Sequence, residues 1–339
     1  MEESCRPGGA PVIGAATGRQ ENPLNLDGSA AQALDRCAKG ELSPEVALLR
    51  LLIAHRDLHA LRSSLDALAR RADQKREMRG AITRIAELLD AHPEGCVLAL
   101  RILEDECAAA DPRSPEQELE RCRHLFDRFV RDSAEASVAL YSFGSRQLLD
   151  AATREVFALL QRLDVLGPER HVLEIGCGIG RFQQALAGRV ATITGIDIAP
   201  GMIETAKKRC AGLANVRLIE TSGRDLSVFP AASFDTLLAI DAMPYVYRAG
   251  AALVATHFAE AARVLRAGGD FVILNLSYRG DLELDRQDAR RLAEAAGLHI
   301  LRNGTADLRL WDGTTFHLRK PETPVGRRGD QPTRFSMRP

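Results

Sequence analysis

The stretch from residue 171 to residue 186, HVLEIGCGIGRFQQAL, constrains the fold of this chain more than any other. It opens with an apolar run typical of a strand buried on both faces: Val172, Leu173 and Ile175. Three glycines follow at alternate positions: Gly176, Gly178 and Gly180. Glycine is needed where a strand turns sharply into a helix and the backbone approaches a ligand. The stretch therefore predicts a strand, a ligand-binding loop and a helix whose first N–H groups are free.

Strand and helix patterns alternate after this stretch, which predicts βαβ units and a parallel sheet. The expected strands span residues 190–197, 216–219, 236–240 and 270–274. The expected helices span residues 200–210, 251–266 and 285–296. Two later segments, 298–301 and 308–318, are expected to complete the sheet by antiparallel pairing around a turn at Asp312-Gly313.

The region before residue 136 has a different, helical pattern. Ser43-Pro44 and Ser114-Pro115 are helix-start signals, a hydroxyl cap followed by proline. A stripe of leucines from Leu51 to Leu68 indicates one face of a small helical bundle, and a homodimer through these helices is the alternative. We expect a disordered tail over residues 1–28, a helical domain over 29–135, an α/β domain over 136–320 and a second tail over 321–339.

Composition and charge limit the partners and the cellular compartment that we expect for this chain. The chain has 339 residues and a net charge of −1, so it has no general attraction to nucleic acid or to an anionic membrane. No run approaches the roughly 18 apolar residues of a membrane span, and no signal-peptide core is evident. The seven cysteines are scattered, without a Cys-x-x-Cys pair, which suggests reduced thiols in a cytoplasmic protein. Cys122 and His124 point apart on a helix, and we expect no metal site.

Ligands of an open parallel sheet bind beyond the carboxyl ends of its strands. This rule places the glycine loop, Asp197, the segment 222–226 and the segment 241–245 around one cleft. Asp197 could accept hydrogen bonds from the vicinal hydroxyls of a ribose, or it could cap the next helix. Asp225 could accept from the exocyclic amine of adenine, or it could be a turn residue.

Four segments in order resemble class I S-adenosylmethionine-dependent methyltransferases. Residues 173–180, LEIGCGIG, resemble motif I of that family, and residues 194–202 resemble the segment that follows it, with an acid closing strand two. Residues 233–237 resemble the start of strand four, and residues 260–269 resemble the approach to strand five, with Ala267 where the family usually has proline. The resemblance covers about residues 140 to 320. It implies a seven-stranded Rossmann-like α/β sheet with helices on both faces, preceded here by an all-α domain that it does not cover.

The same resemblance implies S-adenosyl-L-methionine as the cofactor and a role for each matching position. The glycine loop would approach the methionine part of the cofactor: Gly176, Cys177, Gly178 and Gly180. Glu174 would hold its amino group directly or through water, and Asp197 would bind its ribose. The adenine would meet three residues: Ile198, Asp225 and Leu226. Tyr141 could fold over the cofactor as an aromatic lid.

The candidate groups for proton removal lie just past strand four: Asp241, Tyr245 and Tyr247. Loop capping is the alternative for Asp241, and wall packing for the tyrosines. Tyr278 and Arg279 are expected at the mouth of the cleft, and His257 on the outer face of the sheet is a weaker candidate base.

We expect methyl transfer to an O, N or C nucleophile of a small-molecule acceptor. The alternatives are a non-catalytic cofactor-binding or scaffold protein and a protein or peptide methyltransferase. The absence of an Asn-Pro-Pro-Tyr sequence disfavours nucleic-acid bases as acceptors. A dinucleotide-dependent dehydrogenase is disfavoured because the third glycine follows the second too closely and an acid, Glu174, precedes the first.

Overall fold

The computed structural model describes residues 28–71, 75–107 and 114–322. The two tails expected from the sequence lie almost wholly outside the described residues. In the described part of the chain, no helix is both long and apolar enough to cross a membrane.

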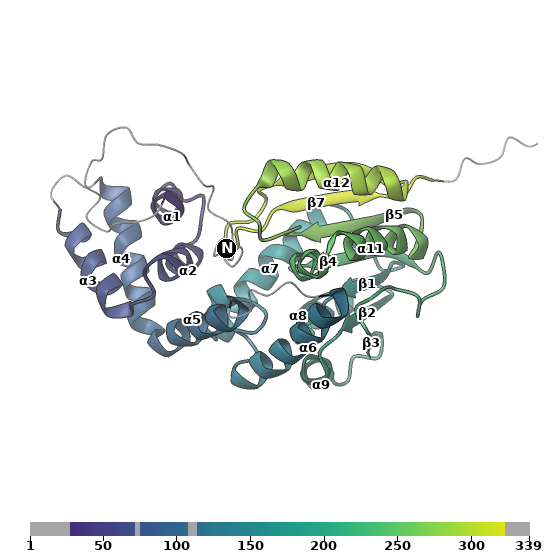
Figure 1. Ribbon diagram of the computed structural model, residues 1–339, viewed down its shortest axis with the longest axis horizontal. Coiled ribbons are helices and arrows are strands. Elements are labelled where there is room, and N and C mark those ends of the chain that lie inside the picture. Colours follow the sequence, from purple (N-terminus) through teal and green to yellow (C-terminus); the bar gives the residue numbers. More distant parts are fainter. Residues whose placement is uncertain (1–27, 72–74, 108–113, 323–339) are drawn as a thin grey trace, which may run out of the picture.

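Six helices precede the sheet region in the described chain (Figure 1). They are α1 (Gly28–Ala38), α2 (Pro44–His55), α3 (Leu58–Ala69), α4 (Arg76–Ala91), α5 (Pro93–Cys107) and α6 (Pro115–Asp132). Both start signals act as predicted: the Val46 N–H donates to Ser43 Oγ at 3.3 Å, and Ser114 forms a capping box with Gln117. The leucine stripe spans two helices rather than one, because Arg56 adopts a left-handed conformation with φ 55° and ends α2.

A seven-stranded sheet forms the other half of the molecule, with strand order β3-β2-β1-β4-β5-β7-β6. The strands are β1 (His171–Ile175), β2 (Thr192–Asp197), β3 (Val216–Glu220), β4 (Phe234–Ile240), β5 (Leu265–Leu274), β6 (His299–Thr305) and β7 (Thr315–Arg319). Strands β1 to β5 are parallel to one another, whereas β7 pairs antiparallel with both β5 and β6. The expected α/β sheet with an antiparallel end is therefore confirmed.

Helices cover both faces of the sheet because successive strand residues point to opposite sides. Val172, Leu238 and Val272 belong to a core shared with α7 (Arg146–Arg162) and α8 (Arg181–Leu186). Leu173 and Leu237 belong to a second core on the opposite face. That second core includes α10 (Met243–Ala249), α11 (Ala251–Val264) and α12 (Leu282–Ala296). The remaining helical elements are η1 (Leu140–Ser142), η2 (Ala187–Arg189) and α9 (Pro200–Arg209).

Residues 243–249, just past the fourth strand, form the short helix α10. One local prediction was wrong. The predicted strand 308–318 is confined to Thr315–Arg319, and the residues before it form the β6–β7 loop. That loop packs against the helices of the N-terminal half: the Ser43 N–H donates to the Arg309 carbonyl at 2.8 Å, and the Leu310 N–H donates to Glu155 Oε2 at 2.8 Å. The Asp312-Gly313 signal predicts that a turn lies in this segment, but the length of the loop depends on these contacts with distant segments, which the local sequence does not reveal.

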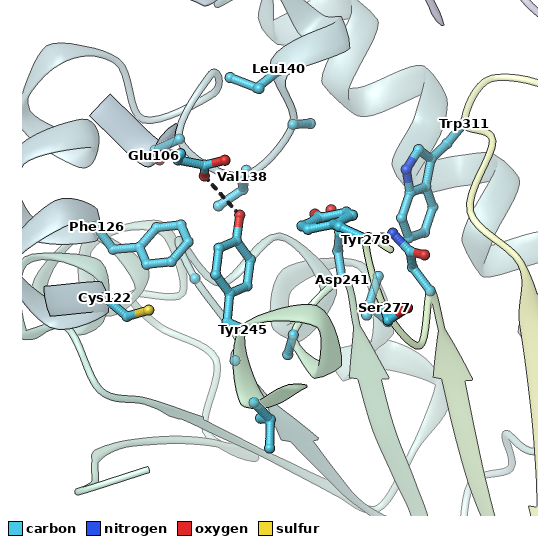
Figure 2. Close-up of a pocket in the computed structure, with 18 of the residues that line it drawn as sticks. Glu106, Cys122, Phe126, Val138, Leu140, Asp241, Tyr245, Ser277, Tyr278 and Trp311 are labelled. Atoms are coloured by element: carbon cyan, nitrogen blue, oxygen red, sulfur yellow. Dashed lines mark hydrogen bonds between the residues drawn. The ribbon is translucent and has the colours of Figure 1, made fainter. Parts of the chain in front are cut away.

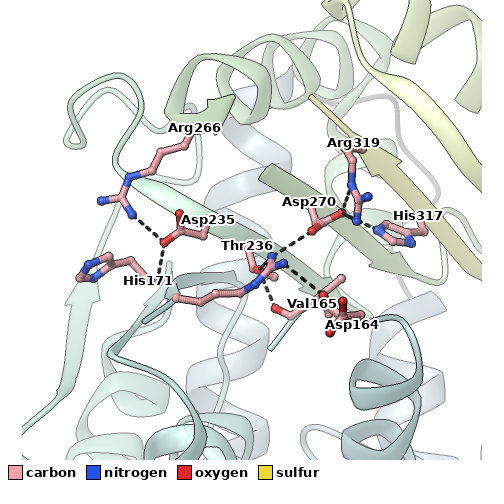
Figure 3. A network of polar contacts seen from close by, with 10 residues as sticks. Asp164, Val165, His171, Asp235, Thr236, Arg266, Asp270, His317 and Arg319 are labelled. Atoms are coloured by element: carbon pink, nitrogen blue, oxygen red, sulfur yellow. Dashed lines mark hydrogen bonds and ion pairs between the residues drawn. The ribbon is translucent and has the colours of Figure 1, made fainter. Parts of the chain in front are cut away.

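A buried polar network ties the strands together at the end opposite the glycine loop (Figure 3). The fully buried carboxylate of Asp270 on β5 accepts hydrogen bonds from His317 Nε2 and Arg319 Nε at 2.8 Å and from Arg170 Nη1 at 3.0 Å. Burial alone raises the pKa of Asp270, but these donors outweigh it and lower the pKa below its usual range. The network joins the antiparallel strand β7 to the parallel part of the sheet.

Candidate active site

The glycine loop after β1 fits closely between two other segments. Gly176 and Gly178 have φ angles of 69° and 50°, a region that side chains disfavour. A Cβ at Gly176 would lie 2.6 Å from the Cβ of Ala242, and one at Gly178 would lie 2.7 Å from Cγ1 of Val138. The loop therefore abuts the end of β4 on one side and the segment before η1 on the other.

Asp197 closes β2 and fixes this loop. Its Oδ2 accepts the Gly178 N–H at 2.9 Å, and its Oδ1 accepts the Ala199 N–H at 2.9 Å. Ala199 is the N-cap of α9, which has no side-chain cap, so Asp197 holds the turn before this helix together with the glycine loop and does not cap the helix itself. Burial raises the pKa of Asp197, while the backbone N–H donors oppose the rise. Each carboxylate oxygen can accept a second hydrogen bond, and the side chain lines the cavity described next.

A cavity of about 610 Å³ runs from the glycine loop to the N-terminal helices. It brings together most of the residues singled out in the sequence: Gly176, Gly178, Asp197, Ile198, Asp225, Asp241, Tyr245 and Tyr141. Helices α2, α5 and α6 supply much of the remaining wall, including Arg50, Leu103, Glu106 and Phe126. The space is thus bounded by the sheet on one side and by the helical region on the other.

Six of the expected residues do not line this cavity: Glu174, Cys177, Gly180, Leu226, Tyr247 and Arg279, the last of which pairs with Asp285 and Asp288. Leu226 is fully buried in the core, and its backbone N–H donates to Glu260 Oε2 at 3.2 Å. Gly180 lies against Ala206 of α9, and the Tyr247 hydroxyl donates to Asp288 Oδ2 at 3.5 Å. Cys177 is buried, and burial raises the pKa of its thiol, so the thiolate is suppressed.

Glu174 lies behind the glycine loop. It is almost fully buried and accepts a hydrogen bond from Gln183 Nε2 at 2.6 Å. Burial raises the pKa of Glu174 to about 8, although Gln183 and Arg181 lower it in part. Arg181 is itself buried, with its guanidinium carbon 4.5 Å from the ring centroid of Phe182.

The polar ends of β4 and β5 form one wall of the cavity. Asp241 and Asn275 both adopt left-handed conformations, with φ angles of 60° and 73°, and Asn275 Nδ2 donates to Asp241 Oδ1 at 3.0 Å. Such conformations cost roughly 1 kcal/mol or more each. Burial raises the pKa of Asp241, opposed by hydrogen bonds from Asn275 and Tyr278. The side chains at this wall are therefore held in place by the chain before any ligand binds.

Tyr245 on α10 meets a residue that the sequence did not suggest (Figure 2). Its hydroxyl donates to Oε1 of Glu106, in the last turn of α5, at 3.0 Å. The Tyr245 ring packs edge-to-face on Phe126 at 4.9 Å and on Tyr278 at 5.8 Å between centroids. Burial raises the pKa of Glu106 to about 7, while the hydrogen bond from Tyr245 lowers it in part. Glu106 falls on the buried face of α5 with Ala99, Ile102 and Leu103. A carboxylate at the helical spacing of these apolar residues is the sequence signal that could have pointed to a buried acid.

Of two other side chains that line the cavity, His257 differs from the expectation and Asp225 follows one of its two alternatives. His257 of α11 was placed on the outer face of the sheet, but it is nearly fully buried and lines the cavity. Burial lowers its pKa, and its Nδ1 lies 2.9 Å from the Leu253 carbonyl. Asp225 lines the cavity but accepts hydrogen bonds from the Ser227 hydroxyl and N–H, as the turn alternative predicted. Within the described residues, no group of three side chains has the arrangement of a metal site.

Part of the sequence is similar to that of known proteins. The sequence profile of a family described as "Methyltransferase domain" matches residues 173–273. The demethylmenaquinone methyltransferase of Tropheryma whipplei (strain Twist) is 36% identical over 156 residues, which cover 46% of this chain and 59% of that protein. The ubiquinone biosynthesis O-methyltransferase of Paracidovorax citrulli is 35% identical over 88 residues, covering 25% and 37%. The chain thus spans less than two thirds of these relatives.

Two solved structures align with part of this chain at low sequence identity. Phosphoethanolamine N-methyltransferase 1 of Haemonchus contortus, solved with phosphoethanolamine and S-adenosylhomocysteine, aligns with a TM-score of 0.47 and 17% identity, covering 65% of this chain and 52% of that chain. The magnesium protoporphyrin IX methyltransferase of Synechocystis aligns with a TM-score of 0.46 and 16% identity, covering 62% and 99%.

Proposed function

We propose that this chain methylates a small-molecule acceptor, from the premise that its α/β domain belongs to the class I S-adenosylmethionine-dependent methyltransferase family. The family match over residues 173–273 and the sheet order support that premise. S-adenosylmethionine is the cofactor of this family, and its sulfonium supplies an electrophilic methyl group when it is bound. The activity and the acceptor of the whole chain are the proposal.

The glycine loop and the end of β2 fit this cofactor. Gly176 and Gly178 line the cavity without a side chain of their own, because Ala242 and Val138 leave no room for a Cβ, and Asp197 borders the same cavity with free acceptor capacity. We assign the loop to the methionine part, Asp197 to the ribose, and Ile198 and Asp225 to the adenine. Four other predicted residues would then support the cofactor site without contacting the cofactor, since none of them lines the cavity: Glu174, Cys177, Gly180 and Leu226.

Methyl transfer from a sulfonium needs the nucleophile, methyl carbon and sulfur in line and away from water. The buried ring of Tyr141 and the half-buried rings of Tyr245 and Tyr278 would exclude water, and Tyr141 retains the role of a lid. Asp241 and Tyr245 are positioned to hold the acceptor group. Tyr247 would act only through the packing of α10 on α12, because its hydroxyl faces Asp288.

The observation that carries the proposal is the single cavity that connects the glycine loop with the helical roof. Its volume of about 610 Å³ suits a small molecule, since ligand pockets of roughly 300–1,000 Å³ are usual. Its walls combine apolar side chains with a few polar groups: Leu49, Ile53, Leu103, Leu140, Asp241 and Tyr245. The division at residues 135 and 136, with the helical region as roof, remains part of the proposal, and so does any homodimer through the N-terminal helices.

A labelled-methyl assay tests this function. The protein is incubated with S-adenosylmethionine carrying a tritiated methyl group and with the small-molecule filtrate of a cell extract. We expect the label in small molecules together with an equal amount of S-adenosylhomocysteine. Label that appears only in added protein or peptide would favour the peptide alternative. Binding of S-adenosylhomocysteine without any transfer would favour a non-catalytic cofactor-binding protein.

A further inference from the structure

Glu106 is a buried carboxylate at the acceptor end of the cavity, and it comes from outside the methyltransferase domain. It lies in the last turn of α5 and is 8% exposed. Among the described residues that line the cavity, it is the carboxylate contributed by helices α1 to α6. A buried acid needs a reason, because an ionised carboxylate away from water is costly unless a partner or a ligand stabilises it.

We propose that Glu106 is the group that removes the proton from the acceptor, and that Tyr245 holds its carboxylate in position. The inference rests on the proposed methyltransferase function and names the base that this function leaves open. It makes the helical region a supplier of a catalytic residue as well as a roof.

The geometry connects Glu106 to the glycine loop through one short segment. Gly176 is in near contact with Ala242, and Tyr245 lies one turn further along the same segment, on α10. The Tyr245 hydroxyl donates to Glu106 Oε1 at 3.0 Å, and all four residues line the same cavity (Figure 2). A group placed beside the Tyr245 ring would therefore have the glycine loop on one side and the carboxylate on the other.

The charged groups that face Glu106 leave its carboxylate without an ion pair in the described part of the chain. On α6, Arg121 pairs with Glu118 at 2.6 Å, and the Cys122 thiol lies nearby. On α10, Arg248 Nε contacts Glu118 at 3.3 Å, while Arg248 Nη2 donates to the backbone carbonyl of Glu106 at 3.2 Å. Asp241 faces it from the end of β4, and its negative charge raises the pKa of Glu106 further.

These surroundings suit a base that works near neutral pH. Burial raises the pKa of Glu106 to about 7, so both protonation states are populated there. A general base is most effective when its pKa is close to the working pH. Asp241, the other candidate, accepts hydrogen bonds from two side chains, Asn275 and Tyr278, whereas Glu106 accepts one, from Tyr245. We therefore assign to Asp241 the positioning of the site and to Glu106 the transfer of the proton.

The step balances with groups already named. An O–H or N–H bond of the acceptor breaks, and its proton goes to the Glu106 carboxylate. The electron pair left on oxygen or nitrogen forms a bond to the methyl carbon, and the carbon–sulfur bond breaks with its electrons remaining on sulfur. The acceptor class is thus a molecule with an ionisable O–H or N–H group on an apolar body, which Leu49, Ile53 and Leu103 would contact.

The test compares Glu106→Gln with Glu104→Gln, the same change at an exposed position of the same helix. Both are assayed with tritiated-methyl S-adenosylmethionine and the small-molecule filtrate, and the binding of S-adenosylhomocysteine is measured by calorimetry. We expect Glu106→Gln to lose roughly 10²–10⁴-fold in transfer rate with unchanged binding of S-adenosylhomocysteine, and Glu104→Gln to match the wild type.

The pH profile separates a base from a structural residue. The wild-type rate should rise through about pH 7, and this limb should disappear in Glu106→Gln. In Tyr245→Phe the carboxylate loses the hydrogen bond that lowers its pKa, so the limb should move to higher pH. A Glu106→Gln enzyme that keeps the wild-type rate or the wild-type acid limb would overturn the inference while leaving the proposed function intact.

The product distinguishes the two acceptor groups. A labelled methylamine should enter an organic phase from alkaline but not from acidic solution, whereas a labelled ether should enter from both. Label in either fraction that depends on Glu106 supports the inference. Label that depends on S-adenosylmethionine but not on Glu106 contradicts it. Absence of any labelled product from the wild-type protein would contradict the proposed function itself, and the inference with it.

Discussion

The hydrogen-bond donors around two aspartates of this sheet distinguish a carboxylate with a structural role from one that can bind a ligand. Asp270 accepts hydrogen bonds from two arginines and a histidine, and these donors lower its pKa despite burial. Asp197 accepts from two neutral backbone N–H groups, and burial raises its pKa. The first carboxylate is saturated by the protein, whereas the second borders a cavity and keeps acceptor capacity. At the residue scale, Asp270 is a structural charge and Asp197 a proposed ligand.

Replacing Asp270 should destabilise the fold without a direct effect on the site. Asp270→Asn leaves Arg170 and Arg319 without their carboxylate, and breaking a buried ion pair typically costs about 3–5 kcal/mol. Urea unfolding at pH 7 measures this change in the free energy of unfolding. Asp235→Asn is the matched control in the same region; its side chain is 25% exposed and pairs with Arg266, so we expect a smaller loss. Equal losses in the two variants would contradict this ranking.

The same carboxylate predicts a pH dependence. Because folding lowers the pKa of Asp270, its contribution to stability is fully present above the unfolded pKa of about 3.9 and is lost as the pH falls through the lower folded value. Urea unfolding between pH 7 and pH 3 should therefore show a smaller acid-dependent loss of stability for Asp270→Asn than for the wild type. Parallel curves for the two proteins would show that Asp270 does not titrate as described.

At the scale of elements, the β6–β7 loop joins the helical region to the sheet. Arg50 of α2 donates to Asp312 Oδ2 from Nε at 3.0 Å and from Nη2 at 2.5 Å. The Ser43 N–H donates to the Arg309 carbonyl, and Glu155 of α7 accepts from the Arg309 and Leu310 N–H groups. Trp311 of this loop lines the cavity. The loop therefore fixes where the roof lies over the site.

The Arg50–Asp312 pair should couple roof position to acceptor binding. Its side chains are 26% and 19% exposed, so a double-mutant cycle with Arg50→Ala and Asp312→Ala should give a coupling energy of about 1–2 kcal/mol. In steady-state kinetics, Arg50→Ala should raise the acceptor KM and leave the binding of S-adenosylhomocysteine unchanged, because the glycine loop lies elsewhere in the cavity. A weakened affinity for S-adenosylhomocysteine with an unchanged acceptor KM would contradict this assignment.

Local sequence signals predicted the part of the cavity wall at the strand ends better than the part that the helices and the β6–β7 loop supply. The glycine loop, Asp197 and Asp241 all follow strands, and the ends of parallel strands meet at one edge of the sheet, so their approach to one cavity could be predicted. Glu106, Phe126 and Trp311 come from segments far from that edge in the sequence, and only packing brings them there. Leu226 shows the converse, because it lies in a predicted cofactor-binding segment but is buried in the core and does not line the cavity.

At the scale of the whole molecule, one apolar core connects the two halves. Leu48 and Leu52 of α2, Tyr141 and Phe143 near η1, and Val172 of β1 belong to the same cluster of buried residues. Separate domains usually have separate cores, with polar interfaces between them. Here the segment after α6 contributes Ala139, Tyr141 and Phe143 to the same buried cluster as the helices and one face of the sheet. The helical region and the sheet are therefore expected to depend on each other for stability.

This shared core predicts cooperative unfolding. Differential scanning calorimetry should give one transition, with a ratio of calorimetric to van't Hoff enthalpy of about one, although chains of this length often unfold in steps. A core substitution in the helical region, Leu48→Ala, should lower the midpoint of that single transition without dividing it. Two resolved transitions in the wild type, of which only one responds to Leu48→Ala, would show that the halves unfold independently.

The central claim is that the glycine loop and Asp197 form the binding site of S-adenosylmethionine. Titration calorimetry with S-adenosylhomocysteine tests it most directly, on the wild type, on Asp197→Ala and on the control Asp132→Ala at an exposed position. We predict binding by the wild type and by the control, and an affinity lower by roughly 10-fold to 100-fold in Asp197→Ala, because hydrogen bonds to a charged group contribute about 1.5–3 kcal/mol. A wild-type protein that does not bind, or an Asp197→Ala variant that binds as tightly as the wild type, would contradict the account.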